Sequence, residues 1–337
     1  MRSQIAAGTE FREPRRDNLG IPKTGRFAKV RTMPATQGVD SELLESGLPE
    51  MPKVNTGSLT AAQIAEYDRE GFLVLPSLLS AADLAPAREA LSQKVSVIAD
   101  DLLANGLIQD KRESDPFETR LVNLFKGLTE ADFLKFGRGW RDRYPGYFHF
   151  MSNPKILSAV ESLIGGEIFA NPVYNARPKV AGVAAGAVPW HQDRSYWPNA
   201  NWNPVITVWI PFVDTDEVNG CLHVWPRTHK TRLVSFHKET YSGTGYTEID
   251  LKEKADRHAV PLPVPAGSAI LFNDRCIHSS TPNRSDHVRW SVDLRYQPTG
   301  QERMDEYGTG FLARSREFPQ RVATLEDWLA ERAEHEG

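Results

Sequence analysis

From residue 168 onward, the sequence is a series of short runs of strand-forming residues, and turn residues such as Asn219-Gly220 and Pro282-Asn283 separate them. Many short strands with this punctuation predict an antiparallel barrel or a double-sheet jelly roll. The fold class that we expect is therefore mainly β. The runs are Ile168–Val180, Val188–Asp193, Val205–Val213, Cys221–Pro226, Ala259–Pro263, Ala269–Asn273 and Arg289–Gln297.

Helix signals dominate the residues before this region. Thr60 is a candidate N-cap for a helix that Gly71 ends, and Ser80 opens a longer helix with an apolar residue at every third or fourth position, to about Asn105. Residues 1–56 show no such period and are expected to form an extended or disordered arm. We expect one domain over 57–337, with helical support at 57–166, a jelly-roll core at 167–300, a lid-like insert at 231–257, and a helical extension at 301–337.

Composition excludes several classes of protein. The 337 residues include 40 Lys and Arg against 44 Asp and Glu, and a net charge of -4 argues against a dedicated nucleic-acid binder. No apolar run approaches the roughly 18 residues of a membrane span, so no membrane partner is expected. Two cysteines cannot form a disulfide framework, which favours a reducing cytoplasm. The oligomeric state is not indicated.

The last predicted strand separates its residues by face. Successive side chains of a strand point to opposite sides. Arg289, Ser291, Asp293 and Arg295 therefore share one face, and Trp290, Val292, Leu294 and Tyr296 share the other. We expect the apolar face to pack on the N-terminal helices. The polar face either meets solvent or contributes to a functional site.

A candidate metal site begins at His191-Gln192-Asp193, which we place on a predicted strand. A spacing of two puts His191 and Asp193 on one face. His278, which follows a later strand, is the candidate third ligand. Two imidazoles and one carboxylate form the facial triad of non-heme Fe(II) oxygenases, which leaves coordination positions open. The alternative is a His–Asp hydrogen bond within a turn.

A competing ligand pair is His237-Lys238-Glu239, inside the polar stretch Thr231–Arg257. We expect this pair to be a solvated surface run, since no apolar strand holds it. Long polar inserts in compact domains are usually lids or disordered, and we favour a lid.

A candidate carboxylate anchor follows His278. The turn at 282–286 predicts a hairpin that returns Arg289 beside the ligand strand, and Ser280 shares a face with His278. A guanidinium grips a carboxylate with two hydrogen bonds, and a hydroxyl adds a third. A linear keto dicarboxylate fits both a metal and this anchor. The alternative for Arg289 is an ion pair with Asp293 or Asp286.

Several segments occur in a fixed order: Pro189–Asp193, Thr207–Pro211, Asn219–Lys230, Gly267–Phe272 and His278–Ser285, followed by Arg289. Together they resemble the phytanoyl-CoA dioxygenase family of Fe(II)- and 2-oxoglutarate-dependent oxygenases, over about residues 60–297. The resemblance implies a double-stranded β-helix core of the cupin-like type. It also implies that His191, Asp193 and His278 are the catalytic iron ligands, and that Arg289, Ser280 and Trp209 contact 2-oxoglutarate.

The resemblance also implies a reaction. The enzyme would consume O2 and 2-oxoglutarate, release succinate and CO2, and hydroxylate an unactivated C–H bond of a small metabolite, such as a natural product or an acyl-type substrate. Halogenating relatives have a small residue at the carboxylate position, so Asp193 favours hydroxylation or a desaturation-type outcome. Family members can add a basic cosubstrate contact from the helical half, which we cannot align near Arg120.

Candidate substrate residues follow the His-x-Asp segment. Tyr196 and Trp197 either wall the substrate or pack against the helices, and Arg194 and Arg275 either pair with an acidic substrate group or lie solvated at the rim. Two other functions stay open: a cupin-like metal enzyme that uses no keto acid, and a catalytically silent jelly-roll module that binds a ligand. Arg289 with Ser280 argues against the first, and the complete triad argues against the second.

Overall fold

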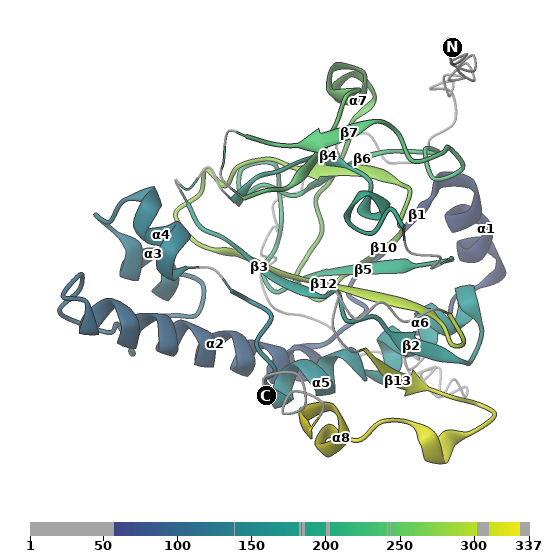
Figure 1. Ribbon diagram of the computed structural model, residues 1–337, viewed down its shortest axis with the longest axis horizontal. Coiled ribbons are helices and arrows are strands. Elements are labelled where there is room, and N and C mark those ends of the chain that lie inside the picture. Colours follow the sequence, from purple (N-terminus) through teal and green to yellow (C-terminus); the bar gives the residue numbers. More distant parts are fainter. Residues whose placement is uncertain are drawn as a thin grey trace, which may run out of the picture. The chain divides into compact units, whose positions relative to one another are not determined.

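The computed structural model describes residues 57–330 except 138, 182, 184–185, 200–202, 241, 243 and 302–309, so the arm predicted at 1–56 lies outside the described residues. Two antiparallel sheets form the centre of the described part, and helices α2, α5 and α6 lie on the outer side of the larger sheet (Figure 1). The predicted mainly-β, double-sheet fold with flanking helices is confirmed.

The first helices begin and end where their capping residues predict. The Thr60 hydroxyl accepts a hydrogen bond from the backbone N–H of Gln63, and the Gln63 side-chain oxygen accepts one from the backbone N–H of Thr60. Ser80 and Asp83 form the same reciprocal pair before the second helix. Gly71, with φ of 84°, ends the first helix in the left-handed conformation that glycine adopts without steric cost. The α-helices are α1 (Ala61–Glu70), α2 (Ala81–Ala104), α3 (Arg120–Phe125), α4 (Glu130–Phe136), α5 (Pro145–Met151), α6 (Pro154–Ile164), α7 (Lys252–His258) and α8 (Leu325–Ala330).

The larger sheet has the strand order β1-β10-β5-β12-β2-β13, with β3 paired to β12 beside this path, and the smaller sheet has the order β4-β11-β6-β9. The larger sheet contains β1 (Phe72–Leu75), β2 (Ile168–Ala170), β3 (Asn175–Lys179), β5 (Ile206–Pro211), β10 (Ala269–Asn273), β12 (Arg289–Pro298) and β13 (Phe311–Arg314). The smaller sheet contains β4 (Val188–His191), β6 (Leu222–Trp225), β9 (Val260–Leu262) and β11 (Ile277–Ser280). A separate hairpin pairs β7 (Phe236–Lys238) with β8 (Thr247–Ile249).

The two faces of β12 have the different roles that its alternation predicts. Trp290, Val292, Leu294 and Tyr296 belong to the large apolar cluster that includes the buried residues of α2, α5 and α6. The Tyr296 hydroxyl also donates to the carbonyl of Met151 at 2.8 Å. The polar face does not meet solvent, because its four side chains are all buried. A second apolar cluster fills part of the space between the sheets, with Phe72, Trp209, Leu222, Val224, Ile270 and Phe272 among its members.

Among the described strands after residue 167, four were not predicted. β7 and β8 are short and polar, so no apolar alternation marks them. β11 was read as the segment after a strand, and β13 lies in the region predicted to be helical, where it pairs with β2. The run Ile168–Val180 is two strands, which separate around Pro172, a residue that cannot donate a backbone hydrogen bond. The C-terminal helix is described to Ala330.

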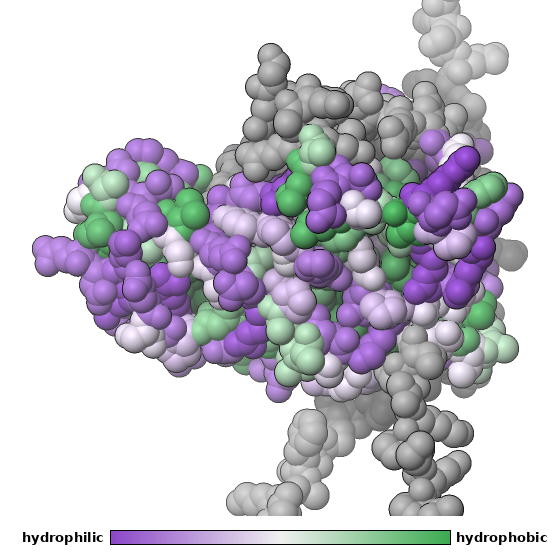
Figure 2. Space-filling model, turned by 90° about the horizontal axis from the view of Figure 1, so that it is seen from below, coloured by the Kyte–Doolittle hydropathy of each residue, from purple (hydrophilic) through white to green (hydrophobic). Residues whose placement is uncertain are grey.

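The one molecular face that Figure 2 shows is largely polar where its residues are described. On the face shown in Figure 2, hydrophilic side chains predominate and apolar ones lie in small groups between them. None of the described helices is both long enough and apolar enough to cross a membrane.

Candidate active site

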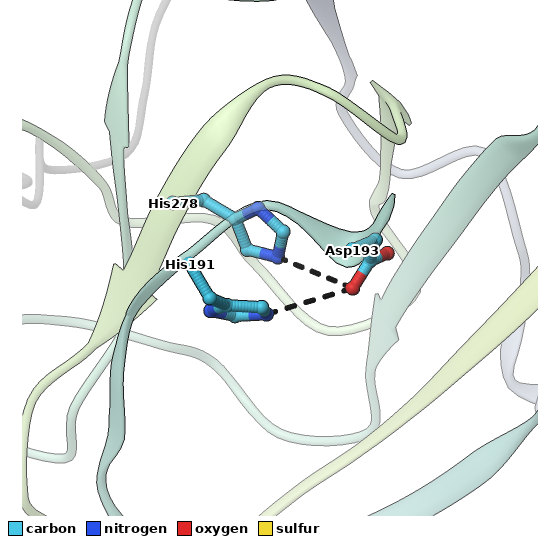
Figure 3. Close-up of side chains that lie close together, drawn as sticks. All are labelled: His191, Asp193 and His278. Atoms are coloured by element: carbon cyan, nitrogen blue, oxygen red, sulfur yellow. Dashed lines mark ion pairs between the residues drawn. The ribbon is translucent and has the colours of Figure 1, made fainter. Parts of the chain in front are cut away.

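Two strands of the smaller sheet bring the three candidate metal ligands together. His191 in β4 and His278 in β11 are direct cross-strand partners, and their ring centroids are 4.2 Å apart. The Asp193 Oδ1 atom lies 3.5 Å from His191 Nε2 and 4.0 Å from His278 Nε2 (Figure 3). All three side chains are buried. Among the described residues, this is the one cluster of three His, Cys, Asp or Glu whose ligand atoms converge, all within 4.8 Å of one another.

The prediction that His191 and Asp193 lie on one strand face is wrong. β4 ends at His191, and Asp193 begins a short 3-10 helix over Asp193–Tyr196. Asp193 therefore approaches His191 through a turn of the backbone and not as the next residue on one strand face. The Ser195 hydroxyl fixes this turn by donating to the carbonyl of Gln192 at 2.7 Å.

Hydrogen bonds orient both imidazoles. His191 Nδ1 lies 2.8 Å from the carbonyl of Pro189, and His278 Nδ1 lies 2.9 Å from the carbonyl of Cys276. A carbonyl only accepts, so each Nδ1 carries the hydrogen and each Nε2 presents its lone pair toward Asp193. Burial, together with the neighbouring His191, lowers the pKa of His278 to about 4. The neutral form that binds metals is thus favoured at physiological pH.

Two residues of the larger sheet hold the Asp193 carboxylate. Arg295 Nη2 donates to Oδ1 at 3.0 Å, and the Thr207 hydroxyl donates to Oδ2. Arg295 and Thr207 are cross-strand partners on β12 and β5. Burial alone would raise the pKa of Asp193, but the Arg295 charge and the nearby His191 hold it well below its ordinary value. Asp193 therefore stays ionised.

One buried cavity contains the three candidate ligands and the candidate anchor. We call it the triad cavity. The predicted cosubstrate residues Arg289, Ser280 and Trp209 also line it. The structure thus brings together all six predicted residues, although their roles in binding stay predictions.

Arg289 reaches this cavity by a different route from the predicted one. It begins β12, which belongs to the larger sheet, so it faces the ligand strand β11 from the opposite sheet and does not lie beside it. Its guanidinium donates to the Ser291 hydroxyl at 2.6 Å and lies 5.4 Å from the centre of the Trp209 ring.

Arg289 does not form the alternative ion pair with Asp293 or Asp286. Asp293 pairs with Arg177 and Arg295, at 2.6 Å in each case, and Asp286 pairs with His287. No described carboxylate lies within 4.0 Å of the Arg289 guanidinium, and its buried Nε has no hydrogen-bond partner there. Burial, with Arg177 nearby, lowers the pKa of Arg289 to about 10. An uncompensated buried cation of this kind favours an anionic ligand.

Lys179 is a buried basic residue that was not predicted, and burial, together with the neighbouring Arg289 charge, lowers the pKa of its amine well below the ordinary value. It is the cross-strand partner of Arg289, it is 1% exposed, and its ammonium donates to the Ser280 hydroxyl at 2.7 Å. Like charges directly opposite each other destabilise a sheet. The sequence feature that could have indicated Lys179 is its spacing of two from Arg177 within a strand-like run, which puts both basic side chains on one strand face. Arg120, by contrast, binds Ser96 and the carbonyl of Lys111 within the helical part.

A second cavity, which we call the large cavity, has a volume of about 490 Å³. It shares Arg177, Arg289 and Arg295 with the triad cavity, so the two cavities adjoin at these side chains. The predicted substrate residues Tyr196 and Trp197 line it. They also pack: Tyr196 meets the His191 ring edge to face, and Trp197 lies beneath the Arg295 guanidinium. Tyr196 and Trp197 therefore both line the cavity and pack against neighbouring side chains.

The other two predicted substrate residues lie elsewhere. Arg194 and Arg275 line neither cavity. Arg194 is buried and forms an ion pair with Asp274 at 2.8 Å. The backbone carbonyl of Arg275 accepts a hydrogen bond from the Gln192 side chain. Contact of these residues with a substrate stays a prediction that the cavity geometry does not favour.

The competing pair His237 and Glu239 does not form a metal site with described neighbours. The exposed His237 ring pairs with Asp250 at 2.9 Å, and the buried Glu239 carboxylate accepts hydrogen bonds from Ser242, Thr244 and Gly245. His237 lies in the short strand β7 (Phe236–Lys238), which is polar and mostly exposed, so no apolar strand holds this pair.

A double-sheet jelly roll with two histidines, one carboxylate and an adjoining cationic anchor defines the class of 2-oxoglutarate-dependent non-heme iron oxygenases. Residues 67–291 match the family described as phytanoyl-CoA dioxygenase (PhyH), and the chain belongs to this family. It is a 2-oxoglutarate-dependent non-heme iron dioxygenase, as the sequence motifs predicted.

Individual relatives are distant. The chain is 26% identical to the peroxisomal phytanoyl-CoA dioxygenase of Bos taurus, over 74% of this chain and 72% of that protein. It is 24% identical to the ectoine dioxygenase of Streptomyces avermitilis, over 73% of this chain and 80% of that protein. The non-heme monooxygenase ThoJ shares the fold with a TM-score of 0.55 and 19% identity, over 81% of this chain and 94% of ThoJ.

Proposed function

We propose that His191, Asp193 and His278 bind Fe(II), that Arg289, Ser280 and Trp209 bind 2-oxoglutarate, and that the enzyme hydroxylates an unactivated C–H bond of a small metabolite held in the large cavity. One observation carries the proposal: a converging set of three ligands and a buried cation without a carboxylate partner line the same cavity. A cavity of about 490 Å³ is in the range of small-molecule sites.

The residues present fit a ferrous ion. Both Nε2 lone pairs and one Asp193 oxygen are directed at a common point, and the opposite Nδ1 atoms are tied to backbone carbonyls, as in most histidine metal sites. The anchor fits the far carboxylate of 2-oxoglutarate, because the buried Arg289 guanidinium lines this cavity without a described carboxylate partner, and Lys179 holds the Ser280 hydroxyl beside it at 2.7 Å. Lys179 therefore joins the proposed anchor, through the Ser280 hydroxyl.

When bound, iron with 2-oxoglutarate and O2 supplies the oxidising power for hydroxylation, with release of succinate and CO2. The protein's part is to position these groups. Arg295 and Thr207 keep Asp193 ionised and fix its orientation. Arg289 orients the cosubstrate, and the Trp209 ring supports the guanidinium. The buried setting of the triad excludes water from the reacting centre.

The experiment that tests this function measures succinate released from 2-oxoglutarate by the purified protein with Fe(II), ascorbate and O2, across a panel of small metabolites. We expect slow release without substrate and faster release with an accepted substrate, whose product gains one oxygen atom. Turnover of a substrate without any requirement for 2-oxoglutarate would indicate the cupin-like alternative. Absence of both iron binding and turnover would indicate the silent module.

Replacement of Thr207 by valine tests the support of Asp193. The variant keeps the shape of the side chain but removes the hydrogen bond to Oδ2. Loss of such an outer partner lowers metal affinity by about 10- to 100-fold, and we expect this loss for Fe(II) by equilibrium dialysis. Thr215→Val is the matched control, because Thr215 is also buried but binds the carbonyl of Val264. An unchanged affinity in Thr207→Val would contradict the proposed ligand role of Asp193.

We also propose that the insert at 231–257 closes over the large cavity. Lys238, Thr244, Gly245 and Tyr246 of this insert line the cavity. The Tyr246 hydroxyl accepts a hydrogen bond from Arg177 at 3.1 Å, so the hairpin contacts the charged centre directly. We expect amide hydrogen exchange of residues 246–249 to slow when metal and 2-oxoglutarate are added, with β10 as an internal reference. Equal exchange in both states would contradict a lid.

A further inference from the structure

The large cavity is lined by positive side chains without any described acidic one. No Asp or Glu occurs among its lining residues, whereas six cationic residues do: Arg141, Arg177, Lys179, Lys238, Arg289 and Arg295. A cavity lined by charges of one sign attracts ligands of the opposite sign. The substrate chemistry therefore depends on which of these charges are already neutralised.

Four of the six cations have an assigned partner. Arg177 pairs with Asp293, and Arg295 pairs with both Asp193 and Asp293. Arg289 and Lys179 form the proposed anchor for the far carboxylate of 2-oxoglutarate. Arg141 and Lys238 are left.

Arg141 is placed to receive an anion. Its Nε donates to the Asn175 amide oxygen at 2.8 Å, which fixes the plane of the guanidinium. No described residue accepts from its two Nη groups, and no described carboxylate lies within 4.0 Å of it. Arg141 is exposed to solvent on one side, and partial burial with the charges of Arg295 and Arg177 lowers its pKa. Its two Nη groups can therefore donate to both oxygens of a carboxylate or phosphate.

Lys238 lines the same cavity from the hairpin strand β7. Its ammonium donates to the carbonyl of Gly245 at 3.2 Å and has no described carboxylate partner. The rest of the cavity wall is aromatic, with Trp140, Tyr196, Trp197 and Tyr246. The cavity thus combines an aromatic surface with two cations that have no carboxylate partner among the described residues.

We propose that the substrate is an anion with an apolar body, whose carboxylate or phosphate group binds Arg141, with Lys238 adding positive charge, while its body lies on the aromatic wall. The inference rests on the proposed function, since that function assigns Arg289 and Lys179 to 2-oxoglutarate. It narrows the substrate class from any small metabolite to acidic ones.

The test measures binding to the full chain loaded with Fe(II) and 2-oxoglutarate without oxygen. Calorimetry compares three probes of similar shape: 3-phenylpropionate, 2-phenylethyl phosphate and the neutral 3-phenylpropionamide. We expect at least one anion to bind about tenfold or more tightly than the amide, because a charge-assisted hydrogen bond is replaced by a neutral one. Arg141→Gln should remove this preference, Arg141→Lys should retain part of it, and the preference should weaken with added salt. Lys230→Gln, which removes an exposed charge outside the cavity, should change nothing.

The anion that binds more tightly identifies the acidic group. Equal binding of the amide and both anions, no measurable binding of either anion, or an unchanged preference in Arg141→Gln would each overturn the proposal. The absorption band of the Fe(II)–2-oxoglutarate complex, recorded on the same samples, tests the proposed binding of iron and cosubstrate separately. If the band is missing while anions still bind through Arg141, the proposed function fails and the anion site stands.

Discussion

The Asp193→Ala variant is expected to lose hydroxylation and to bind Fe(II) at least about 100-fold more weakly, beyond the usual effect of losing an outer-sphere partner. Asp193 supplies the only negative charge among the three ligands, and alanine leaves two neutral imidazoles. The fold should survive, because Arg295 keeps its second carboxylate partner, Asp293, at 2.6 Å. Dialysis against Fe(II) and succinate release measure the two effects.

The matched control is Asp286→Ala, which removes a fully exposed carboxylate outside the site. It should retain wild-type iron binding and turnover. Thermal unfolding of both variants shows whether either is misfolded. Full turnover by Asp193→Ala would remove Asp193 from the ligand set, and with it the proposed metal site.

The second large effect concerns Arg289. Replacement by glutamine is expected to weaken 2-oxoglutarate binding by about 30-fold or more, since losing one partner of a buried, hydrogen-bonded charge pair costs about 2–5 kcal/mol. The dissociation constant, measured anaerobically with Fe(II) present, reports this loss. Arg289→Lys retains the charge but not the two-pronged guanidinium. Its dissociation constant for 2-oxoglutarate should lie between those of the wild type and Arg289→Gln.

The melting temperature of the free protein distinguishes a binding role of Arg289 from a structural one. Arg289 has no described carboxylate partner, so the charge is uncompensated in the free protein, and its removal should not lower the melting temperature of that state. Arg177→Gln is the control, because it breaks a 2.6 Å ion pair with Asp293 and should destabilise the free protein. The loss should be smaller than about 3–5 kcal/mol, the cost of leaving a buried charge unpaired, because Arg177 is 21% exposed and Asp293 keeps Arg295 as a partner. If Arg289→Gln destabilises the free protein as much, the ion-pair role would be restored.

Local patterns in the sequence predicted much of the fold. The capping residues Thr60 and Ser80 marked helix starts, and the alternation in Arg289–Gln297 separated the helix-facing side of β12 from the side toward the triad. These features depend on neighbours within a few residues. The position of Arg289 depends on which sheet β12 joins, and strand pairing across long stretches of sequence decides that.

The candidate metal ligands were predicted from the sequence, but the residues that support them were not. His191, Asp193 and His278 belong to motifs, so their meeting was expected. Arg295 and Thr207 were visible only as polar members of alternating strands, and Lys179 only as a charge in a strand-like run. Their importance comes from burial and from partners on other strands, which composition and spacing do not specify.

The division of β12 between packing and chemistry has a consequence for how this chain tolerates change. A single inserted residue within 289–298 would exchange the two sets of side chains, placing tryptophan and tyrosine rings at the metal and arginines against the helices. Substitutions can alter either set alone, but a change in length cannot. We therefore expect insertions and deletions in active variants to occur outside this strand.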